Sequence, residues 1–403
     1  MDGALYAFVE DFRDEGVNQV LDRVTAYGLR GVTVAAACEQ ARDLTPHGAS
    51  RLTLRRDGVH FPPAEDVFAG LRLVPPVQPG AGDRPLAELR RACDERGLEL
   101  HGWTVFLRNA ALGQADLDVT VRSCFGDRGS PADLCPSHPD VRSYAVALAR
   151  AVARQGVDTV VAEALHFGMF AHGCHHERCF VEFGPMDAFL FGLCFCHHCM
   201  RRATDLGVKA EVAREECARI VAGVLDGDPP AEGEVTRAAL TAYAGPEVVA
   251  YARARSESVT SLVAEVSAAV TAEGAVLTFL DATGAWKGYA DGLPPAGLAA
   301  HDAWQFGVDL VALGDLVPSF AVPAYARDPR RVAEDLAAYR RSIGKNPGLR
   351  AVLRPGVPDA DSAEQLAAKV RESGEAGADA VDFYAYGLAP FSALDRIPMA
   401  LEG

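Results

Sequence analysis

The sequence lacks the patterns by which exported and membrane-spanning chains are recognised. It opens with MDGALYAFVEDF, which has no basic start followed by a long apolar segment, so no signal peptide is expected. No run of about 18 apolar residues occurs in the 403 residues, so no transmembrane helix is expected. Ten cysteines in a chain without an export signal indicate a reducing compartment, and we predict a cytoplasmic protein.

Motifs that bind nucleotides are also absent. No Gly-x-Gly-x-x-Gly segment follows an early strand pattern, so a dinucleotide-binding Rossmann domain has no support, and no P-loop occurs. The formal net charge of −16 argues against an extended surface for nucleic acid or anionic membranes, because both require clustered Lys and Arg. The net negative charge does not exclude a local basic pocket.

Short apolar, β-branched segments alternate with long amphipathic ones, which is typical of βα units and a parallel sheet. Eight such strands with intervening helices predict an α/β protein with a (β/α)8 TIM barrel, formed as one domain by residues 1–403. The predicted strands are residues 4–11, 31–37, 98–106, 158–165, 275–281, 308–313, 349–355 and 380–386.

Two long insertions interrupt this pattern, one after the second strand and one after the fourth. Residues 39–90 are rich in Pro, Gly and Arg, and residues 166–245 carry a cluster of Cys and His. Segments that follow the strands of a TIM barrel build its active-site face, so both insertions are expected to contribute to function.

Soft metal ligands are concentrated in residues 192–200, which read GLCFCHHCM. A C-x2-C spacing lets two sulfurs converge on one zinc ion at about 2.3 Å, and a tetrahedral site needs four ligands. Buried, inert cysteines are the alternative, which the polar His-His insert disfavours. The three cysteines of this pattern are Cys194, Cys196 and Cys199.

A resemblance to a known family runs through the same region. Residues 135–168 read CPSHPDVRSYAVALARAVARQGVDTVVAEALHFG, and after a loop the chain continues CFCHHCMRRA. These segments resemble the catalytic barrel of glycoside hydrolase family 42, the zinc-containing β-galactosidases. That family has a C-P-x-x-P segment that opens a helix, a strand that ends near its acid/base Glu, and a C-x-C-x2-C segment. The resemblance covers about residues 130–205.

The resemblance implies one zinc ion held by four thiolates. A site closed in this way has no open position for substrate, so the zinc is expected to be structural and to join the loops after strands three and four. Cys174 and Cys179 remain alternatives for the fourth ligand. The ligands that the resemblance implies are Cys135, Cys194, Cys196 and Cys199.

The resemblance also implies a pair of catalytic carboxylates, an acid/base Glu at the end of strand four and a nucleophilic Glu at the end of strand seven. Glu163 takes the first role by position, although Ala162 replaces the family's Asn, which contacts the sugar 2-hydroxyl. Strand seven carries Arg354 and no Glu nearby. The sequence therefore does not support a standard retaining mechanism, which needs two carboxylates about 5–5.5 Å apart.

Other carboxylates at the expected barrel mouth are candidates for the second catalytic group. Glu10 ends predicted strand one, Asp281 ends strand five, and Asp382 lies in strand eight. Any of them could pair with Glu163 at the wider spacing of an inverting enzyme, where water fits between the two groups. The alternative for each is a salt-bridged or solvated strand end.

His166 is a candidate general base or hydrogen-bonding group, because it follows Glu163 by three residues; a buried histidine satisfied by a carbonyl is the alternative. Substrate contacts are expected from aromatic and charged side chains near strand ends. These are Trp103, Arg108, Trp286, Tyr325, Arg354 and Asp382.

Three classes of function stay open. The first is a glycoside-hydrolase-like enzyme that cleaves a small glycoside or glycoconjugate. The second is a diverged barrel that binds a sugar-like or acidic ligand without turnover. The third is a metal-dependent enzyme that uses His166, His172 and His175, since imidazole suits transition metals. The expected partner is a small carbohydrate-like molecule, without nucleic acid or membrane; a homo-oligomer stays open.

Overall fold

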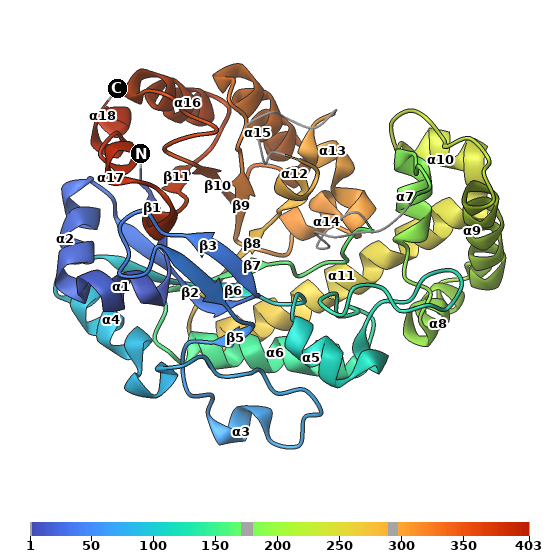
Figure 1. Cartoon of the computed structure of the whole chain (residues 1–403), viewed down its shortest axis with the longest axis horizontal. Helices are drawn as coiled ribbons and strands as arrows, with labels where there is room; N and C mark the ends of the chain where they lie inside the picture. Colours follow the sequence, from blue (N-terminus) through green and yellow to red (C-terminus); the bar gives the residue numbers. More distant parts are fainter. Residues whose placement is uncertain (1, 171–179, 289–296, 403) are drawn as a thin grey trace.

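Eight parallel strands close into a barrel in the computed structural model, which describes residues 2–170, 180–288 and 297–402 (Figure 1). The sheet closes because the first strand pairs with both the second and the last. The predicted α/β fold, a (β/α)8 TIM barrel, is confirmed. The barrel strands are β1 (Ala4–Ala7), β2 (Gly31–Cys38), β6 (Glu99–Val105), β7 (Thr159–Glu163), β8 (Val276–Leu280), β9 (Ser319–Pro323), β10 (Gly348–Leu353) and β11 (Ala380–Phe383).

Helices surround this barrel and cover the outer faces of its strands, whose apolar side chains form one continuous core with them. Among the described residues, none of the helices combines the length and apolarity needed to cross a membrane. The helices that follow the barrel strands include α1 (Val9–Glu15), α2 (Val17–Ala26), α4 (Pro85–Asp94), α5 (Ala110–Ala115), α6 (Pro139–Ala153), α11 (Pro246–Ala272), α12 (Thr283–Trp286), α13 (Ala299–Asp302), α14 (Leu310–Gly314), α15 (Pro329–Ile343), α16 (Ala363–Glu375), α17 (Phe391–Leu394) and α18 (Ile397–Glu402).

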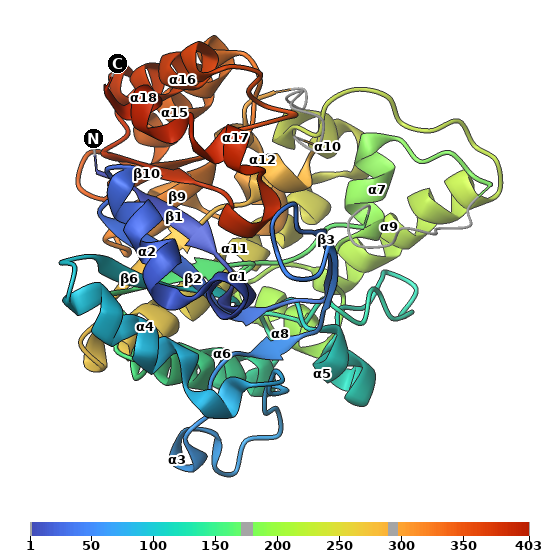
Figure 2. The same cartoon turned by 60° about the vertical axis from the view of Figure 1, so that its left-hand side comes forward.

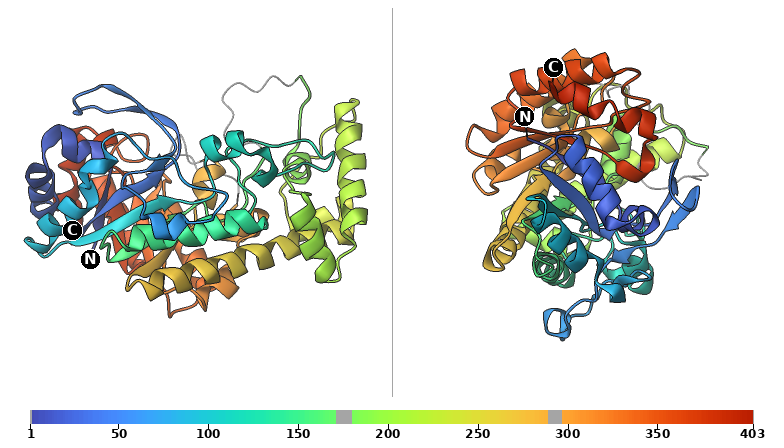
Figure 3. Two further views of the ribbon diagram at one scale, coloured as in Figure 1. Left: turned by 90° about the horizontal axis from the view of Figure 1, so that it is seen from below. Right: turned by 90° about the vertical axis from the view of Figure 1, so that its left-hand side faces the viewer.

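The segment between β7 and β8 forms a helical bundle at one end of the molecule (Figure 1). The long helix α11 starts in this bundle and runs back to pack on α6 and β8 of the barrel (Figure 3). The bundle is therefore joined to the barrel by a continuous helix. Its other helices are α7 (Pro185–Phe191), α8 (His197–Asp205), α9 (Ala210–Leu225) and α10 (Arg237–Ala244).

The segment after β2 forms a hairpin that stands beside the barrel (Figure 2). Strands β3 (Ala41–Leu44) and β4 (Leu52–Arg55) pair in antiparallel register. The short strand β5 (Gly58–Val59) then extends the barrel sheet antiparallel to the end of β2, and helix α3 (Glu65–Phe68) follows. The hairpin contacts the helix that follows β1, because Arg55 at the end of β4 forms an ion pair with Glu10 in α1.

The predicted sixth strand is wrong. Most of the predicted strand 308–313 lies in helix α14, which spans residues 310–314, and the sixth barrel strand is β9, farther along the chain. The Asp309 side chain accepts hydrogen bonds from the backbone N–H groups of Val311 and Ala312, an N-cap that starts a helix. A short apolar run such as VDLVAL is equally compatible with a strand and with a buried helix.

A buried ion pair joins two neighbouring strands inside the barrel. Asp382 of β11 accepts hydrogen bonds from both Nε and Nη2 of Arg350 in β10, at 2.8 and 2.6 Å. Its Oδ1 also accepts the backbone N–H of Ala4 at 2.8 Å, and the residue is 1% exposed. Asp382, expected to bind substrate, therefore has both carboxylate oxygens engaged within the barrel.

Asp382→Ala is expected to lower the free energy of unfolding by about 3–5 kcal/mol, because it leaves the Arg350 guanidinium without its buried partner. Asp22→Ala is the control, since Asp22 pairs with Arg96 at the surface and its removal is expected to cost less than about 1 kcal/mol. Urea denaturation of both variants measures the difference. Equal losses of stability would contradict this role of Asp382.

Candidate functional site

Glu163 is the last residue of β7 and lies at the carboxyl ends of the barrel strands, where TIM barrels place their active sites. Its Oε2 accepts a hydrogen bond of 2.5 Å from the indole N–H of Trp103 in β6, and the residue is half-buried. Burial, together with the charge of Glu39, raises the pKa of Glu163 to about 7, against the opposing effects of Trp103 and Arg108. A carboxyl group with this pKa is suited to general acid catalysis.

The backbone is strained directly after this carboxyl group. Ala164 has a φ of 54°, in the left-handed region that L-residues with a Cβ rarely adopt. The strain is maintained by pairing with the chain after β6, where Phe106 and Leu107 donate backbone hydrogen bonds to Glu163 and Ala164. Strained residues of this kind concentrate at functional sites, which agrees with the position of Glu163.

Arg108, which follows β6, is held between two carboxylates near Glu163. Its Nε donates to Glu39 at 2.7 Å and its Nη1 donates to Asp133 at 2.8 Å. Burial raises the pKa of Asp133 to about 6, although Arg108 opposes this shift. The guanidinium also lies 5.4 Å from the ring of Trp286. Arg108 is therefore oriented by the protein itself and brings Glu39 into the surroundings of Glu163.

Sequence reasoning missed Glu39 as a site residue. It is the first residue after β2, where the sequence pattern predicts the start of an insertion. The signal that could have found it is its position, because the residue after a barrel strand faces the same mouth as Glu163.

Aromatic side chains surround Trp103 inside the barrel mouth. The ring of Tyr6 lies 5.5 Å from Trp103, Phe8 lies at 5.4 Å, and Tyr384 lies at 5.7 Å. Tyr325 then packs on Tyr384 at 6.2 Å. Trp103 and Tyr325 were expected here, whereas Tyr6, Phe8 and Tyr384 were missed, although Tyr6 and Phe8 alternate along one face of the first predicted strand. Such rings can stack on the apolar face of a sugar.

Arg354 extends this aromatic group on one side. Its guanidinium lies 4.4 Å from the Tyr325 ring and donates to both oxygens of Asp359, at 2.7 and 2.6 Å. Burial raises the pKa of Asp359, while Arg354 lowers it. Arg354 therefore sits near the mouth as predicted, already in a bidentate ion pair.

The predicted position of Glu10 at the end of strand one is wrong. β1 ends at Ala7, and Asp11 starts helix α1 by accepting the backbone N–H of Phe8 at 2.8 Å, which places Glu10 in the first helical turn. There Glu10 pairs with Arg55 at 2.8 Å. Although burial raises the pKa of Glu10, the nearby His60 and Arg55 lower it overall.

Asp281 and His166 are buried behind the mouth. Asp281 is 0% exposed and accepts hydrogen bonds from the N–H and hydroxyl of Thr283 and from the hydroxyl of Tyr339 in α15. His166 donates from Nδ1 to the Phe167 carbonyl at 2.8 Å, and burial lowers its pKa. His166 is thus a neutral, carbonyl-bound ring packed 4.9 Å from Trp286.

Part of the predicted metal chemistry cannot be placed. His172, Cys174, His175 and Cys179 lie outside the described residues.

The four cysteines that the family resemblance selects lie together. The Cys135 sulfur is 3.5 Å from Cys196, 3.4 Å from Cys199 and 3.9 Å from Cys194, and all four sulfurs lie within 4.8 Å of one another. A disulfide has sulfurs only about 2.05 Å apart, whereas tetrahedral zinc with bonds of about 2.3 Å holds them about 3.8 Å apart. The cluster has the spacing of a metal site.

The surroundings of this cluster fit a charged metal centre. Zinc with four thiolates carries net negative charge, and the backbone N–H of Arg122 donates to the Cys194 sulfur at 3.4 Å. Arg255 of α11 is 4% exposed, and its Nε has no partner among the described residues. Burial lowers the pKa of Arg255, while the charges of Cys199 and Cys194 oppose this shift. Arg255 therefore supplies a buried positive charge beside the cluster.

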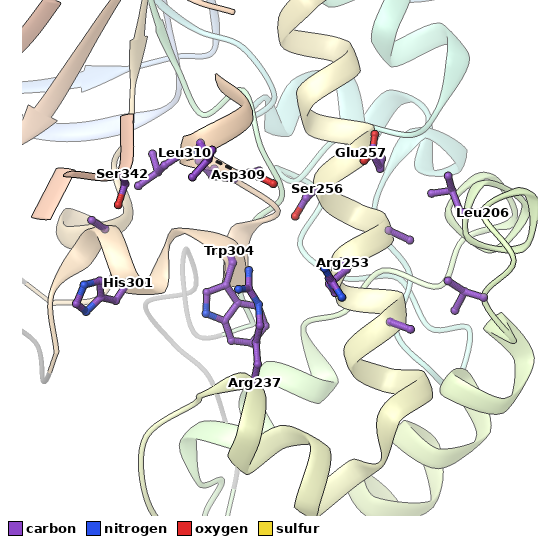
Figure 4. Close-up of a pocket in the computed structure, with 16 residues that line it drawn as sticks. Leu206, Arg237, Arg253, Ser256, Glu257, His301, Trp304, Asp309, Leu310 and Ser342 are labelled. Carbon is purple, nitrogen blue, oxygen red and sulfur yellow. Dashed lines mark hydrogen bonds between the residues drawn. The ribbon is translucent and has the colours of Figure 1, made fainter. Parts of the chain in front are cut away.

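A separate groove of about 790 Å³ lies away from the barrel mouth, between α11, α14 and the start of α10 (Figure 4). Arg237 stacks over Trp304 there, with its guanidinium 5.2 Å from the ring. None of the residues placed at the mouth lines this groove, so its size says nothing about the site around Glu163.

No protein-family model matches the chain, and no curated protein matches its sequence. Its fold resembles those of solved structures. An α-L-fucosidase isoenzyme 2 from Paenibacillus thiaminolyticus aligns at 11% identity and a TM-score of 0.56, over 99% of this chain and 48% of its own. A β-galactosidase from the psychrophilic Marinomonas ef1 aligns at 14% identity and 0.56, over 100% of this chain and 59% of its own.

The catalytic domain of a β-amylase from Paenibacillus polymyxa is similar over nearly its full length. It aligns at 8% identity and a TM-score of 0.55, over 99% of this chain and 97% of its own. The chain thus spans about half of the fucosidase, 59% of the β-galactosidase and nearly all of this catalytic domain. At these identities the similarities establish the barrel fold.

Proposed function

We propose that this protein is a glycoside-hydrolase-like enzyme that cleaves a small glycoside or glycoconjugate, with Glu163 as its acid/base. The observation that carries the proposal is the half-buried residue Glu163 at the barrel mouth, whose carboxyl pKa is raised to about 7. In its protonated form Glu163 would donate a proton to the leaving oxygen. The resemblance to glycoside hydrolase family 42 and the fold similarity to a fucosidase and a β-galactosidase support this function.

We propose Glu39 as the second carboxylate. It acts on the pKa of Glu163 and is bonded to Arg108, which also interacts with Glu163. Asp281 is enclosed by Thr283 and Tyr339, whereas Glu10 lies in helix α1 and is not among the charges that shift the pKa of Glu163. Glu39 would supply negative charge near the proton donor, either to activate water or to stabilise the developing oxocarbenium ion.

Glu163→Gln is expected to lower hydrolysis of a susceptible chromogenic glycoside by at least about 100-fold, because an amide cannot donate the proton. Glu95→Gln, at an exposed surface position, is the matched control and should keep full activity. Initial rates across a panel of nitrophenyl glycosides measure both variants. A Glu163→Gln variant as active as the control would overturn the assignment.

The activity is expected to fall as the pH rises through about 7, because Glu163 must be protonated to act as an acid. The Trp103 hydrogen bond lowers the pKa of Glu163, so Trp103→Phe is expected to move this alkaline limb to higher pH. Trp304→Phe, outside the mouth, is the control and should leave the profile unchanged. An unshifted or downward-shifted limb in Trp103→Phe would contradict the role of this bond.

A diverged barrel that binds its ligand without turnover is the second candidate. Arg354 favours this function, because it occupies the position at which the resembling family has its nucleophilic Glu. Its guanidinium forms a bidentate ion pair with Asp359. Saturable binding of a sugar in calorimetry, together with no hydrolysis by the unaltered protein, would select this function over the first.

We propose further that the four cysteines hold one structural zinc ion. The protein is expected to contain about one zinc per chain, and Cys135→Ser is expected to lose it together with thermal stability. Cys93→Ser is the control, since Cys93 is buried in α4 outside the cluster. Elemental analysis and melting curves measure both effects. Zinc retained in full by Cys135→Ser would contradict this ligand set.

A further inference from the structure

A groove of about 700 Å³ lies outside the barrel, where α6, α8 and α11 meet. α6 and α11 pack side by side along it, and α8 packs against α11 (Figure 1). The groove carries a surplus of positive charge, although the chain as a whole has a net charge of −16. The charged residues that line it are Arg142, Arg150, Arg201, Arg202 and Glu265.

The carboxylate of this groove is already neutralised. Arg142, which is 7% exposed, donates to Glu265 at 2.5 Å and to the carbonyls of Pro136 and Ser258 at 3.2 and 3.0 Å. These bonds fix Arg142 in the wall of the groove. The positive charges of the other three arginines are therefore not balanced by Glu265.

Those three arginines have no carboxylate within ion-pair distance among the described residues. Arg150 and Arg201 are exposed, and Arg202 donates only to the hydroxyl of Ser261, at 3.4 Å. Burial lowers the pKa of Arg202, and the like charge of Arg142 lowers it further, while Glu265 opposes both effects. Repulsion between the guanidinium groups indicates that an anion would stabilise the groove.

The charges are spread along the groove rather than gathered at one point. Arg142, Val146 and Arg150 follow one another at four-residue intervals on one face of α6. Arg202 and Arg142 both donate to the Ser261 hydroxyl, so Arg202 lies at the Arg142 end of the groove, and Arg150 lies about 12 Å from that end along the axis of α6. A linear chain of phosphates can extend from Arg202 to Arg150, whereas a single phosphate does not cover this length.

We propose that this groove binds a linear chain of phosphate groups. Guanidinium groups bind phosphate oxygens in a bidentate manner, and the hydroxyl of Ser143 on the same face of α6 adds a neutral donor. The chain of phosphates could belong to free polyphosphate or to the tail of a nucleotide, which share this chemistry. The inference does not depend on the function proposed for the barrel mouth.

Isothermal titration with sodium tripolyphosphate at low ionic strength tests the proposal. The double variant Arg150→Glu/Arg201→Glu is expected to bind at least about tenfold more weakly, since charge-assisted contacts are lost. Arg330→Glu/Arg341→Glu on α15 is the matched control, with the same change in net charge and both arginines exposed outside the groove. It should bind as the unaltered protein does.

Absence of binding, or equal weakening by the two double variants, would overturn the proposal. Orthophosphate bound as tightly as tripolyphosphate would also overturn it, because arginines spread along the groove should favour several linked phosphates over one. Tighter binding of ATP than of tripolyphosphate would identify a nucleotide as the source, and the reverse order would identify free polyphosphate. Arg150→Glu alone, which lies on α6 apart from the cysteines of α8, should weaken binding in the same direction and guards against misfolding.

Discussion

Closure of the parallel sheet is the constraint on which the candidate site depends. Because β1 pairs with both β2 and β11, the carboxyl ends of all eight strands converge on one mouth. Glu39, Trp103 and Glu163 are far apart in sequence, yet each lies at or near the end of a different strand. Barrel closure brings these residues to one mouth. There Trp103 donates a hydrogen bond to Glu163, and Arg108 donates one to Glu39.

Much of the fold could be predicted because hydrophobic periodicity reports which faces are buried. Periodicity does not distinguish helix from strand at residues 308–313, where one capping side chain, Asp309, starts a helix. The position of Glu163 at the end of a barrel strand could be predicted from the sequence pattern, while its role as the acid/base stays a proposal. The position of Glu39 after a barrel strand was available from the sequence, but its ion pair with Arg108 joins two different strands, and hydrophobic periodicity does not encode such contacts.

The cysteine cluster shows a similar division between local and distant information. The spacing of Cys194, Cys196 and Cys199 predicts a shared site, because it is contained within one turn that leads into α8. Spacing alone could not choose Cys135, which comes from another loop and joins the cluster only through the fold. The net charge of the chain also does not predict the charge of each surface. Although the chain has a net charge of −16, it contains an arginine-rich groove as well as a mouth with several carboxylates.

The hydrogen bond between Trp103 and Glu163 also gives the protein an internal optical probe. The indole N–H points at the carboxyl group, so gain or loss of its proton changes the electric field at the chromophore. The chain has three tryptophans, and Trp103 alone donates to Glu163 among the bonds described. Ultraviolet difference spectra can therefore follow the protonation of this carboxyl group without substrate or label.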